Sequence, residues 1–244
     1  MRIALLPTCV VDTVAPQVGA ATVRVLRRAG HEVVVPDAVT CCGQPAWNAG
    51  FAEEAALVAR TTLDALAEAD VDAICVPAGS CTTMIRVFWQ ELFHLVGDDA
   101  AVARAATVAD RTFEFAELLD RFGDAPGGRH DAAVARHHSC HMLRELGLRD
   151  EAGRLLDGLE GCTVVPWPGD DRCCGFGGTF AMKQPETSVA MADDKIDGLL
   201  ATGATELVGC DQSCLLHLAG RLERRGETAI RVRHLAEVLD EAAP

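Results

Sequence analysis

The sequence predicts an α/β protein made of two homologous halves, each built around its own parallel sheet. Three observations support this prediction: repeated cysteine spacings, repeated flanking segments, and short apolar runs that alternate with amphipathic stretches. With 244 residues, 49% of them apolar, the chain is long enough for one large domain or two small ones. Because the repeat is longer than a hundred residues, we interpret it as a duplicated domain and not as a solenoid.

Eight of the eleven cysteines fall into two sets with nearly the same spacing. In each set a single cysteine precedes a Cys-Cys-Gly segment, and a Ser-Cys pair follows it. Each cysteine of the second set lies 131 to 133 residues after its counterpart in the first. The first quartet is Cys9, Cys41, Cys42 and Cys81, and the second quartet is Cys140, Cys173, Cys174 and Cys214.

Two later segments, 115–120 and 235–240, also resemble each other, but their offset is only 120 residues. The first half therefore contains about a dozen extra residues after Cys81. Between the halves lies a segment rich in turn-forming residues, 124–129. We expect one half to span residues 1–125 and the other 130–244.

Strands alternate with helices in both halves, as in parallel α/β units. Pro7 ends the first apolar run, and Gly30 ends the first amphipathic stretch. In the first half we expect strands at 3–6, 32–35, 73–76 and 112–115, and helices at 18–29, 52–69, 82–95 and 116–122. In the second half we expect strands at 132–135, 163–165, 206–208 and 230–233, and helices at 143–159, 186–201 and 215–224.

Both quartets follow the carboxyl ends of predicted strands. Ligands of open parallel sheets bind outside these ends, so three segments of each half should converge there. Four thiolates match a [4Fe–4S] cluster or a structural zinc ion. Adjacent cysteines chelate one small ion poorly but reach different irons of a cluster, so we favour one or two [4Fe–4S] clusters, with zinc as the alternative in one half. We expect the glycine after each pair to let the backbone pass close to the cluster.

The remaining cysteines and three histidines have more than one reading. Buried free cysteine behaves as a small hydrophobe, so Cys75 and Cys162 are predicted core residues. Cys210 is equally compatible with packing and with ligation. Near Cys140, His137, His138 and His141 are candidates for direct ligation or, preferably, for hydrogen bonds to cluster sulfur.

The formal charge of −14 argues against a nucleic-acid or anionic-membrane partner. No apolar stretch approaches the 18 or so residues of a membrane span, and the amino-terminal run lacks a signal-peptide pattern. We therefore expect a cytoplasmic protein. Four basic residues near the quartets are candidates for holding a substrate carboxylate or for balancing cluster charge: Arg86, Arg136, Arg144 and Lys183.

The motifs resemble the CCG (cysteine-rich) domain family, which includes the cysteine-rich subunit of heterodisulfide reductase, the glycolate oxidase iron–sulfur subunit and lactate utilisation protein A. The similarity is strongest to the last group. Its Cys-Cys-Gly-Gln-Pro-x-x-Asn-x-Gly signature is present at 41–50, and Gly-Ser-Cys-x-x-Met-x-Arg at 79–86. The second half contains Cys-Cys-Gly-Phe-Gly-Gly-Thr-Phe at 173–180, and the resemblance covers essentially the whole chain.

This resemblance implies an iron–sulfur electron-transfer subunit of a multi-protein L-lactate oxidation system. The implied partners are a ferredoxin-like iron–sulfur protein and a third small subunit. The alternatives are a thiol–disulfide, heterodisulfide or quinone reductase subunit, and a zinc-stabilised scaffold. Heterodisulfide reductase has a fifth cysteine where this chain has Ala78 and Asp211. The change favours an ordinary cubane cluster, with Asp211 or Cys210 as a substitute ligand in the second half.

Overall fold

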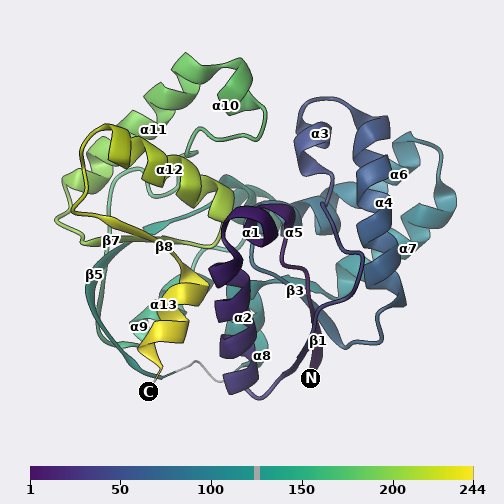
Figure 1. Ribbon diagram of the computed structural model, residues 1–244, viewed down its shortest axis with the longest axis horizontal. Coiled ribbons are helices and arrows are strands. Elements are labelled where there is room, and N and C mark those ends of the chain that lie inside the picture. Colours follow the sequence, from purple (N-terminus) through teal and green to yellow (C-terminus); the bar gives the residue numbers. More distant parts are fainter. Residues whose placement is uncertain (124–126, 244) are drawn as a thin grey trace.

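The computed structural model describes residues 1–123 and 127–243 and contains two four-stranded parallel sheets (Figure 1). Both sheets have the same strand order, in which the first strand of each half lies between the second and the third. The first sheet has the order β2-β1-β3-β4 and comprises β1 (Arg2–Leu5), β2 (Glu32–Val34), β3 (Ala73–Val76) and β4 (Thr112–Glu114). The second has the order β6-β5-β7-β8 and comprises β5 (Arg129–His137), β6 (Glu160–Val165), β7 (Glu206–Gly209) and β8 (Arg231–His234).

The two halves share one core between their sheets. Side chains alternate across a strand, so Ile3 and Leu5 point into this central core while Ala4 and Leu6 point to the outer face. The helices of the central layer are α2 (Pro16–Arg28), α8 (Phe115–Phe122), α9 (Glu151–Asp157) and α13 (Leu235–Ala242), which Figure 1 shows gathered between the sheets. Helix α2 packs on α13, and α8 packs on α9.

Matched ion pairs connect these helices across the junction. Arg24 of α2 contacts Asp240 of α13 at 2.5 Å, and Arg154 of α9 contacts Asp120 of α8 at 2.7 Å. The two aspartates hold equivalent places in the repeated segments 115–120 and 235–240. The halves are therefore related by an approximate twofold arrangement, in which each contributes the same pair of surfaces.

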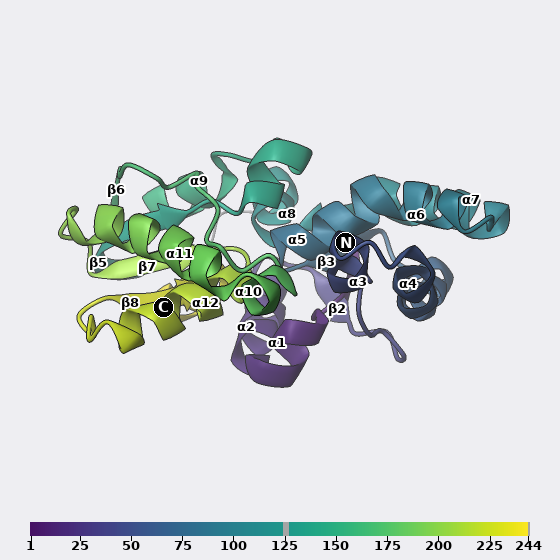
Figure 2. The ribbon, with the colours of Figure 1, turned by 90° about the horizontal axis from the view of Figure 1, so that it is seen from above.

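The outer faces of the sheets are covered by other helices. On the first sheet, α4 (Ala52–Glu68), α6 (Trp89–Leu95) and α7 (Asp99–Asp110) enclose a second core. On the second sheet, α11 (Pro185–Leu200) and α12 (Gln212–Arg224) enclose a third. Four short helices meet near the centre of Figure 2: α1 (Cys9–Val14), α3 (Gln44–Asn48), α5 (Gly79–Thr83) and α10 (Phe180–Lys183).

The structure confirms the duplicated α/β fold, with several local differences. The extra residues of the first half form α7, which the sequence did not reveal. The predicted helix 82–95 contains a π-helical turn, η1 (Met84–Phe88). The predicted helix 143–159 is wrong, because Gly147 adopts φ 70° and separates η2 (Met142–Leu146) from α9.

Strand β5 begins at Arg129, inside the predicted linker, and residues 124–126 of that linker lie outside the described part of the chain. The half boundaries at 125 and 130 stay a prediction.

No helix in the described ranges combines the length and the apolar character required to cross a bilayer.

Candidate metal centre at the junction of the halves

The structure brings each predicted quartet together at the carboxyl ends of its sheet. Cys9 begins α1 just after β1, and Cys81 lies in α5 just after β3. The adjacent pair Cys41 and Cys42 lies in the loop between β2 and α3. The Sγ atoms of Cys9 and Cys41 are 3.6 Å apart, and those of Cys42 and Cys81 are 3.3 Å apart.

The second quartet repeats this arrangement. Cys140 follows β5, Cys214 lies in the first turn of α12 after β7, and Cys173 and Cys174 lie in the loop after β6. The thiol of Cys173 has Cys140 and Cys174 as neighbours, and that of Cys174 has Cys214, in the same order as in the first quartet. All eleven cysteines are free thiols. The two sets are therefore equivalent in sequence and in their place at the sheet edge.

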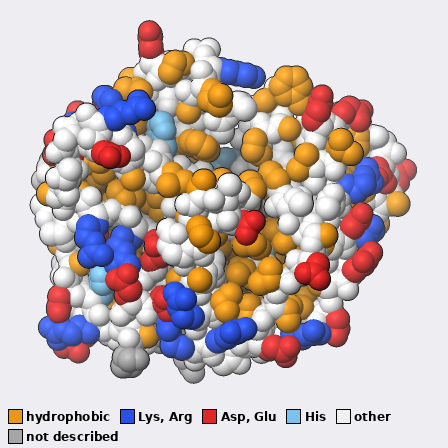
Figure 3. Space-filling view, in the orientation of Figure 1, with side chains coloured by type: hydrophobic (Ala, Val, Ile, Leu, Met, Phe, Trp, Pro, Cys, Tyr) orange, Lys and Arg blue, Asp and Glu red, His pale blue; other side chains and the backbone are white. Residues whose placement is uncertain are grey.

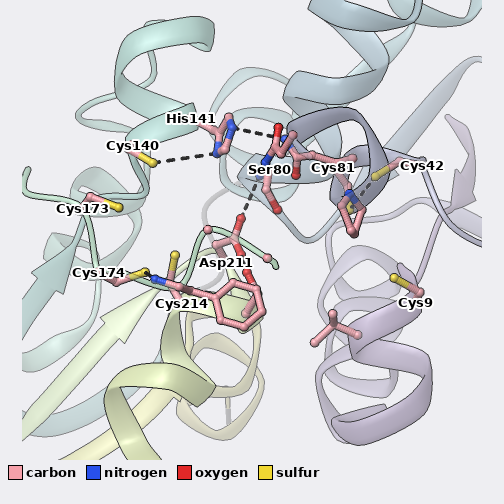
Figure 4. A pocket seen from close by; sticks show the side chains of 18 of the residues that line it. Cys9, Cys42, Ser80, Cys81, Cys140, His141, Cys173, Cys174, Asp211 and Cys214 are labelled. Atoms are coloured by element: carbon pink, nitrogen blue, oxygen red, sulfur yellow. Dashed lines mark hydrogen bonds between the residues drawn. The ribbon is translucent and has the colours of Figure 1, made fainter. Parts of the chain in front are cut away.

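A single cavity of about 100 Å³ borders all eight cysteines. Figure 4 shows the second quartet on one side of it and Cys9, Cys42 and Cys81 on the other, with Ser80 and Asp211 between them. In the space-filling view of Figure 3, the surface is hollowed between the two upper lobes, with hydrophobic side chains around the hollow. The two quartets thus face a common space at the junction of the halves.

Each quartet has one thiol that ionises first. Hydrogen bonds from Cys42 and Cys9 lower the pKa of Cys41 to about 3. In the second half, hydrogen bonds from Cys140 and Cys174 lower the pKa of Cys173 to about 2. The Gly43 N–H donates to Cys41 Sγ, and the Gly175 N–H donates to Cys173 Sγ, each at 3.4 Å. The thiolate is the form that binds metal, so the lowered pKa gives each quartet one cysteine in its metal-binding form.

The glycine after each cysteine pair has a packing role that the sequence did not reveal. Gly43 and Gly175 have φ values of 87° and 89°, in the left-handed region that disfavours other residues. A Cβ at Gly43 would lie 2.6 Å from the carbonyl oxygen of Ala55, and one at Gly175 would lie 2.5 Å from that of Ser188. The glycines therefore let the cysteine loops pack against α4 and α11, while the expectation that they make room for a cluster stays a prediction.

The three histidines near Cys140 point in different directions. His138 contacts the Arg149 carbonyl at 2.8 Å and the Asp170 carboxylate at 3.3 Å, away from the thiols. His141 borders the cavity, where Nε2 lies 3.2 Å from the Gln44 side chain and Nδ1 lies 3.8 Å from Cys140 Sγ. His137 alone of the three belongs to a tight ligand group, with Cys174 and Cys214, whose donor atoms lie within 4.8 Å of one another.

Outside the quartets, the other cysteines lie in or against the core. Cys75 is fully buried in the central core and Cys162 packs against that core, as the sequence predicted. Cys210, which the sequence left undecided, is also buried in the central core and does not line the cavity.

Asp211 connects the halves. Its Oδ2 accepts a hydrogen bond from the Ser80 N–H at 2.8 Å, and its Oδ1 accepts one from the Ser213 hydroxyl at 2.5 Å. Asp211 is 1% exposed and borders the cavity. Because both carboxylate oxygens already accept hydrogen bonds, the structure favours a role in joining the halves over the substitute-ligand role considered from the sequence.

The four basic residues named as carboxylate holders do not reach the cavity. Arg86 pairs with Glu117 at 2.8 Å, and Arg136 donates to the Arg149 carbonyl at 3.2 Å. Arg144 and Lys183 are exposed. Over the described residues, Asp211 is the only Asp, Glu, Arg or Lys in the cavity lining.

One residue near the site was missed from the sequence. Lys195 is 1% exposed, and its Nζ donates to the carbonyls of Gly169, Asp170 and Arg172 at 2.5, 3.1 and 2.8 Å. A signal was present, since Lys195 interrupts an apolar stripe on its helix formed by Ala192, Ile196 and Leu199.

The donor set fits a metal centre of thiolate chemistry. Each half supplies four thiols from three separate segments, and both quartets border one cavity. A buried histidine without a hydrogen-bond partner among the described residues lies beside one of them. Four-cysteine sets of this kind hold [4Fe–4S] clusters or zinc.

Comparison with known proteins agrees with the fold and the site. The cysteine-rich (CCG) domain family matches residues 3–86 and 134–219, and the chain belongs to this family. It is 42% identical to lactate utilization protein A of an Exiguobacterium species over 243 residues, which cover 98% of this chain and 97% of the relative.

Proteins of the same name from Bacillus cytotoxicus and Bacillus cereus are 41% and 42% identical, covering 98% of this chain and 99% of each relative. Among solved structures, the Escherichia coli transcriptional repressor ascG aligns with 99% of this chain and 87% of its own, at 13% identity. Its TM-score is 0.23, too low to indicate a shared fold.

Proposed function

We propose that this protein is an iron–sulfur electron-transfer subunit of a multi-protein system that oxidises L-lactate. The observation that supports this most strongly is the arrangement of eight free cysteines in two equivalent quartets around one cavity. The first quartet would hold one [4Fe–4S] cluster and the second quartet another. Such clusters supply one-electron transfer when bound.

The lining of the cavity favours electron transfer over direct binding of a hydroxy acid. Asp211 and the thiols are its acidic groups, and within the described ranges no arginine or lysine borders it. A carboxylate substrate would therefore meet negative charge without a positive partner. This supports a division of labour in which another subunit binds lactate and this chain accepts the electrons.

The relatives support the assignment of the substrate. Several proteins that are about 42% identical over nearly the whole chain are called lactate utilization protein A. On this basis we propose as partners a ferredoxin-like iron–sulfur protein and a third small subunit, all in the cytoplasm. Co-purification of the three tagged proteins from anaerobic lysate tests the partnership.

Metal analysis tests the iron–sulfur assignment directly. The full chain, purified anaerobically, is expected to contain iron and acid-labile sulfide in equal amounts and to give an EPR signal on reduction. Stoichiometric zinc without sulfide would contradict the proposal and support a zinc-stabilised scaffold. Retained partner binding by Cys174→Ser would then be the test of the scaffold role.

A second candidate function has one observation in its favour. The cavity between the quartets would place a small neutral substrate in contact with both of them. This suits a disulfide or a quinone, as in a thiol–disulfide, heterodisulfide or quinone reductase subunit. Turnover of disulfide or quinone, but not of lactate, with the partner subunits present would select this function.

A further inference from the structure

Two buried side chains make the second quartet chemically different from the first. The first is His137, the last residue of β5, which is 3% exposed. Neither of its ring nitrogens has a hydrogen-bond partner among the described residues, although buried polar atoms nearly always have one. Its ring lies beside Cys174 and Cys214, and the ligand atoms of the three residues are within 4.8 Å of one another.

The ring of His137 is suited to donate. An imidazole carries at least one N–H in either protonation state, and sulfur is the only acceptor type in the tight group that contains His137. His137 is therefore placed to donate a hydrogen bond to sulfur at the second quartet, either of a cysteine or of the bound centre.

The second side chain is Lys195. Its Nζ is fixed by three carbonyl oxygens of residues 169–172, the segment that leads into Cys173. Burial lowers the pKa of Lys195 to about 8, and the charges of Cys174 and Cys214 act in the opposite direction. At neutral pH the ammonium is therefore present beside the second quartet.

The first half has uncharged residues at both positions. The offset of 131 residues that relates Cys9 to Cys140 makes Leu6 the counterpart of His137 in the first half, and Leu6 is 1% exposed. Thr62 of α4 takes the place of Lys195 of α11. Its hydroxyl donates to the Cys41 carbonyl at 3.1 Å and accepts from the Thr40 N–H at 3.0 Å, so it holds the same loop without adding charge.

This difference has a direct effect on reduction potential. Reduction adds negative charge, which a hydrogen-bond donor and a nearby cation stabilise. Asp211 opposes the effect, because its carboxylate acts on Cys140 and Cys214. That carboxylate already accepts hydrogen bonds from Ser80 and Ser213. Asp211 is the carboxylate that acts on these cysteines, whereas Asp170 and Asp171 act on Lys195.

We propose that His137, supported by Lys195, makes the centre of the second quartet the one that is reduced at the higher potential. This inference rests on the proposed function, since it requires a redox centre in each half. It assigns His137 as a positioning and tuning residue and leaves the four thiolates as the ligands.

An EPR-monitored redox titration of the anaerobically purified full chain tests the proposal. Cys9→Ser and Cys140→Ser assign the signals by removing one centre each. In His137→Leu, the midpoint potential of the second centre is expected to fall and that of the first to stay unchanged. We expect the ratio of reduced to oxidised second centre to fall about tenfold at fixed potential, or ~59 mV for one electron. Lys195→Thr, which copies the first half, is expected to shift the same midpoint in the same direction.

The matched control is His138→Gln, because His138 is also buried but faces away from the thiols. Its midpoints should equal those of the unsubstituted protein. His137→Gln, which keeps an N–H donor, should recover most of the shift and separates the donor role from a loss of packing.

The outcomes separate the two proposals. Absence of iron and sulfide from the unsubstituted protein would overturn the proposed function. Two centres whose midpoints do not change in His137→Leu, or a second centre with the lower midpoint, would overturn this inference alone. Loss of second-centre iron in both His137→Leu and His137→Gln would also overturn it, because it would identify His137 as a ligand.

Discussion

Ala78 and Asp211 hold equivalent positions in the two halves and pair with each other in an antiparallel bridge at the junction. The segment just before the last cysteine of each quartet is thus also the point where the halves meet. The pair is asymmetric, because the Asp211 side chain also accepts from the Ser80 N–H. Asp211, which has alanine as its counterpart in the first half, therefore joins the segments that carry the last cysteine of each quartet.

Asp211→Ala is expected to weaken this junction. The substitution leaves the half-buried Ser80 N–H without its acceptor, at a cost of about 1–3 kcal/mol in the free energy of unfolding. Urea unfolding of the full chain measures it, with the exposed Asp37 as the matched control in Asp37→Ala. Equal stability of the two variants would show that the bridge contributes nothing.

Glu114 makes the free energy of unfolding fall as the pH rises from about 4.5 to 8. This N-cap residue of α8 is fully buried, and burial raises its pKa to about 8. The folded state therefore holds the proton more tightly than the unfolded state, so its contribution is complete below about pH 4.5 and is lost as the pH rises toward 8. The free energy of unfolding should fall by up to about 1.4 kcal/mol per pH unit between about pH 6.5 and 8. Glu114→Gln should flatten the slope; an unchanged slope would contradict the assignment.

His234 has the opposite effect from the equivalent position on α13. It is fully buried, its Nδ1 accepts from the Ala236 N–H, and burial lowers its pKa to about 4. The unfolded state then binds the proton more tightly, so stability is complete above about pH 6.5 and is lost as the pH falls toward 4. Thermal unfolding of Glu114→Gln between pH 4 and 7 should show this loss, because that variant lacks the opposing slope of Glu114. If His234→Gln in the same background were to lose stability as steeply, another group would be responsible.

Gly43→Ala and Gly175→Ala are expected to be strongly destabilising, by more than about 2 kcal/mol, because strain at positive φ adds to a Cβ clash with helix backbone. Gly50 offers the control, since its φ is 84° but nothing lies within 4 Å of a Cβ there. Gly50→Ala should cost only about 1 kcal/mol. Denaturant titration of the three variants measures the difference, and equal costs would show that strain alone determines the glycine requirement.

Cys210→Ala and Cys214→Ala separate a core cysteine from a proposed ligand four residues away. Cys214→Ala should remove about half of the bound iron, because it breaks only the second quartet. Cys210 lies in the central core and outside the cavity, so Cys210→Ala should keep all of it. Iron analysis of both purified variants is the measurement, and loss of iron from Cys210→Ala would place that residue among the ligands.

Local pattern in the sequence was sufficient for the duplication, the parallel strands and the grouping of each quartet. Strands and helices were predicted where apolar periodicity was strong, and the cysteine spacing followed because it repeats after the carboxyl ends of strands. The pattern was insufficient where a glycine or a backbone contact interrupted it. The break at Gly147 and the approach of Gly43 to Ala55 depend on neighbours that the local sequence does not specify.

The relation between the halves depends on long-range packing. The sequence contains two four-cysteine sets, and their chemistry follows from residue type and spacing alone. Only the shared central core brings both sets to one cavity, and only that packing turns His137 toward the thiols while His138 faces away. Three histidines within five residues cannot be distinguished by spacing, because their directions are determined by the end of β5 and by the loops that cover it.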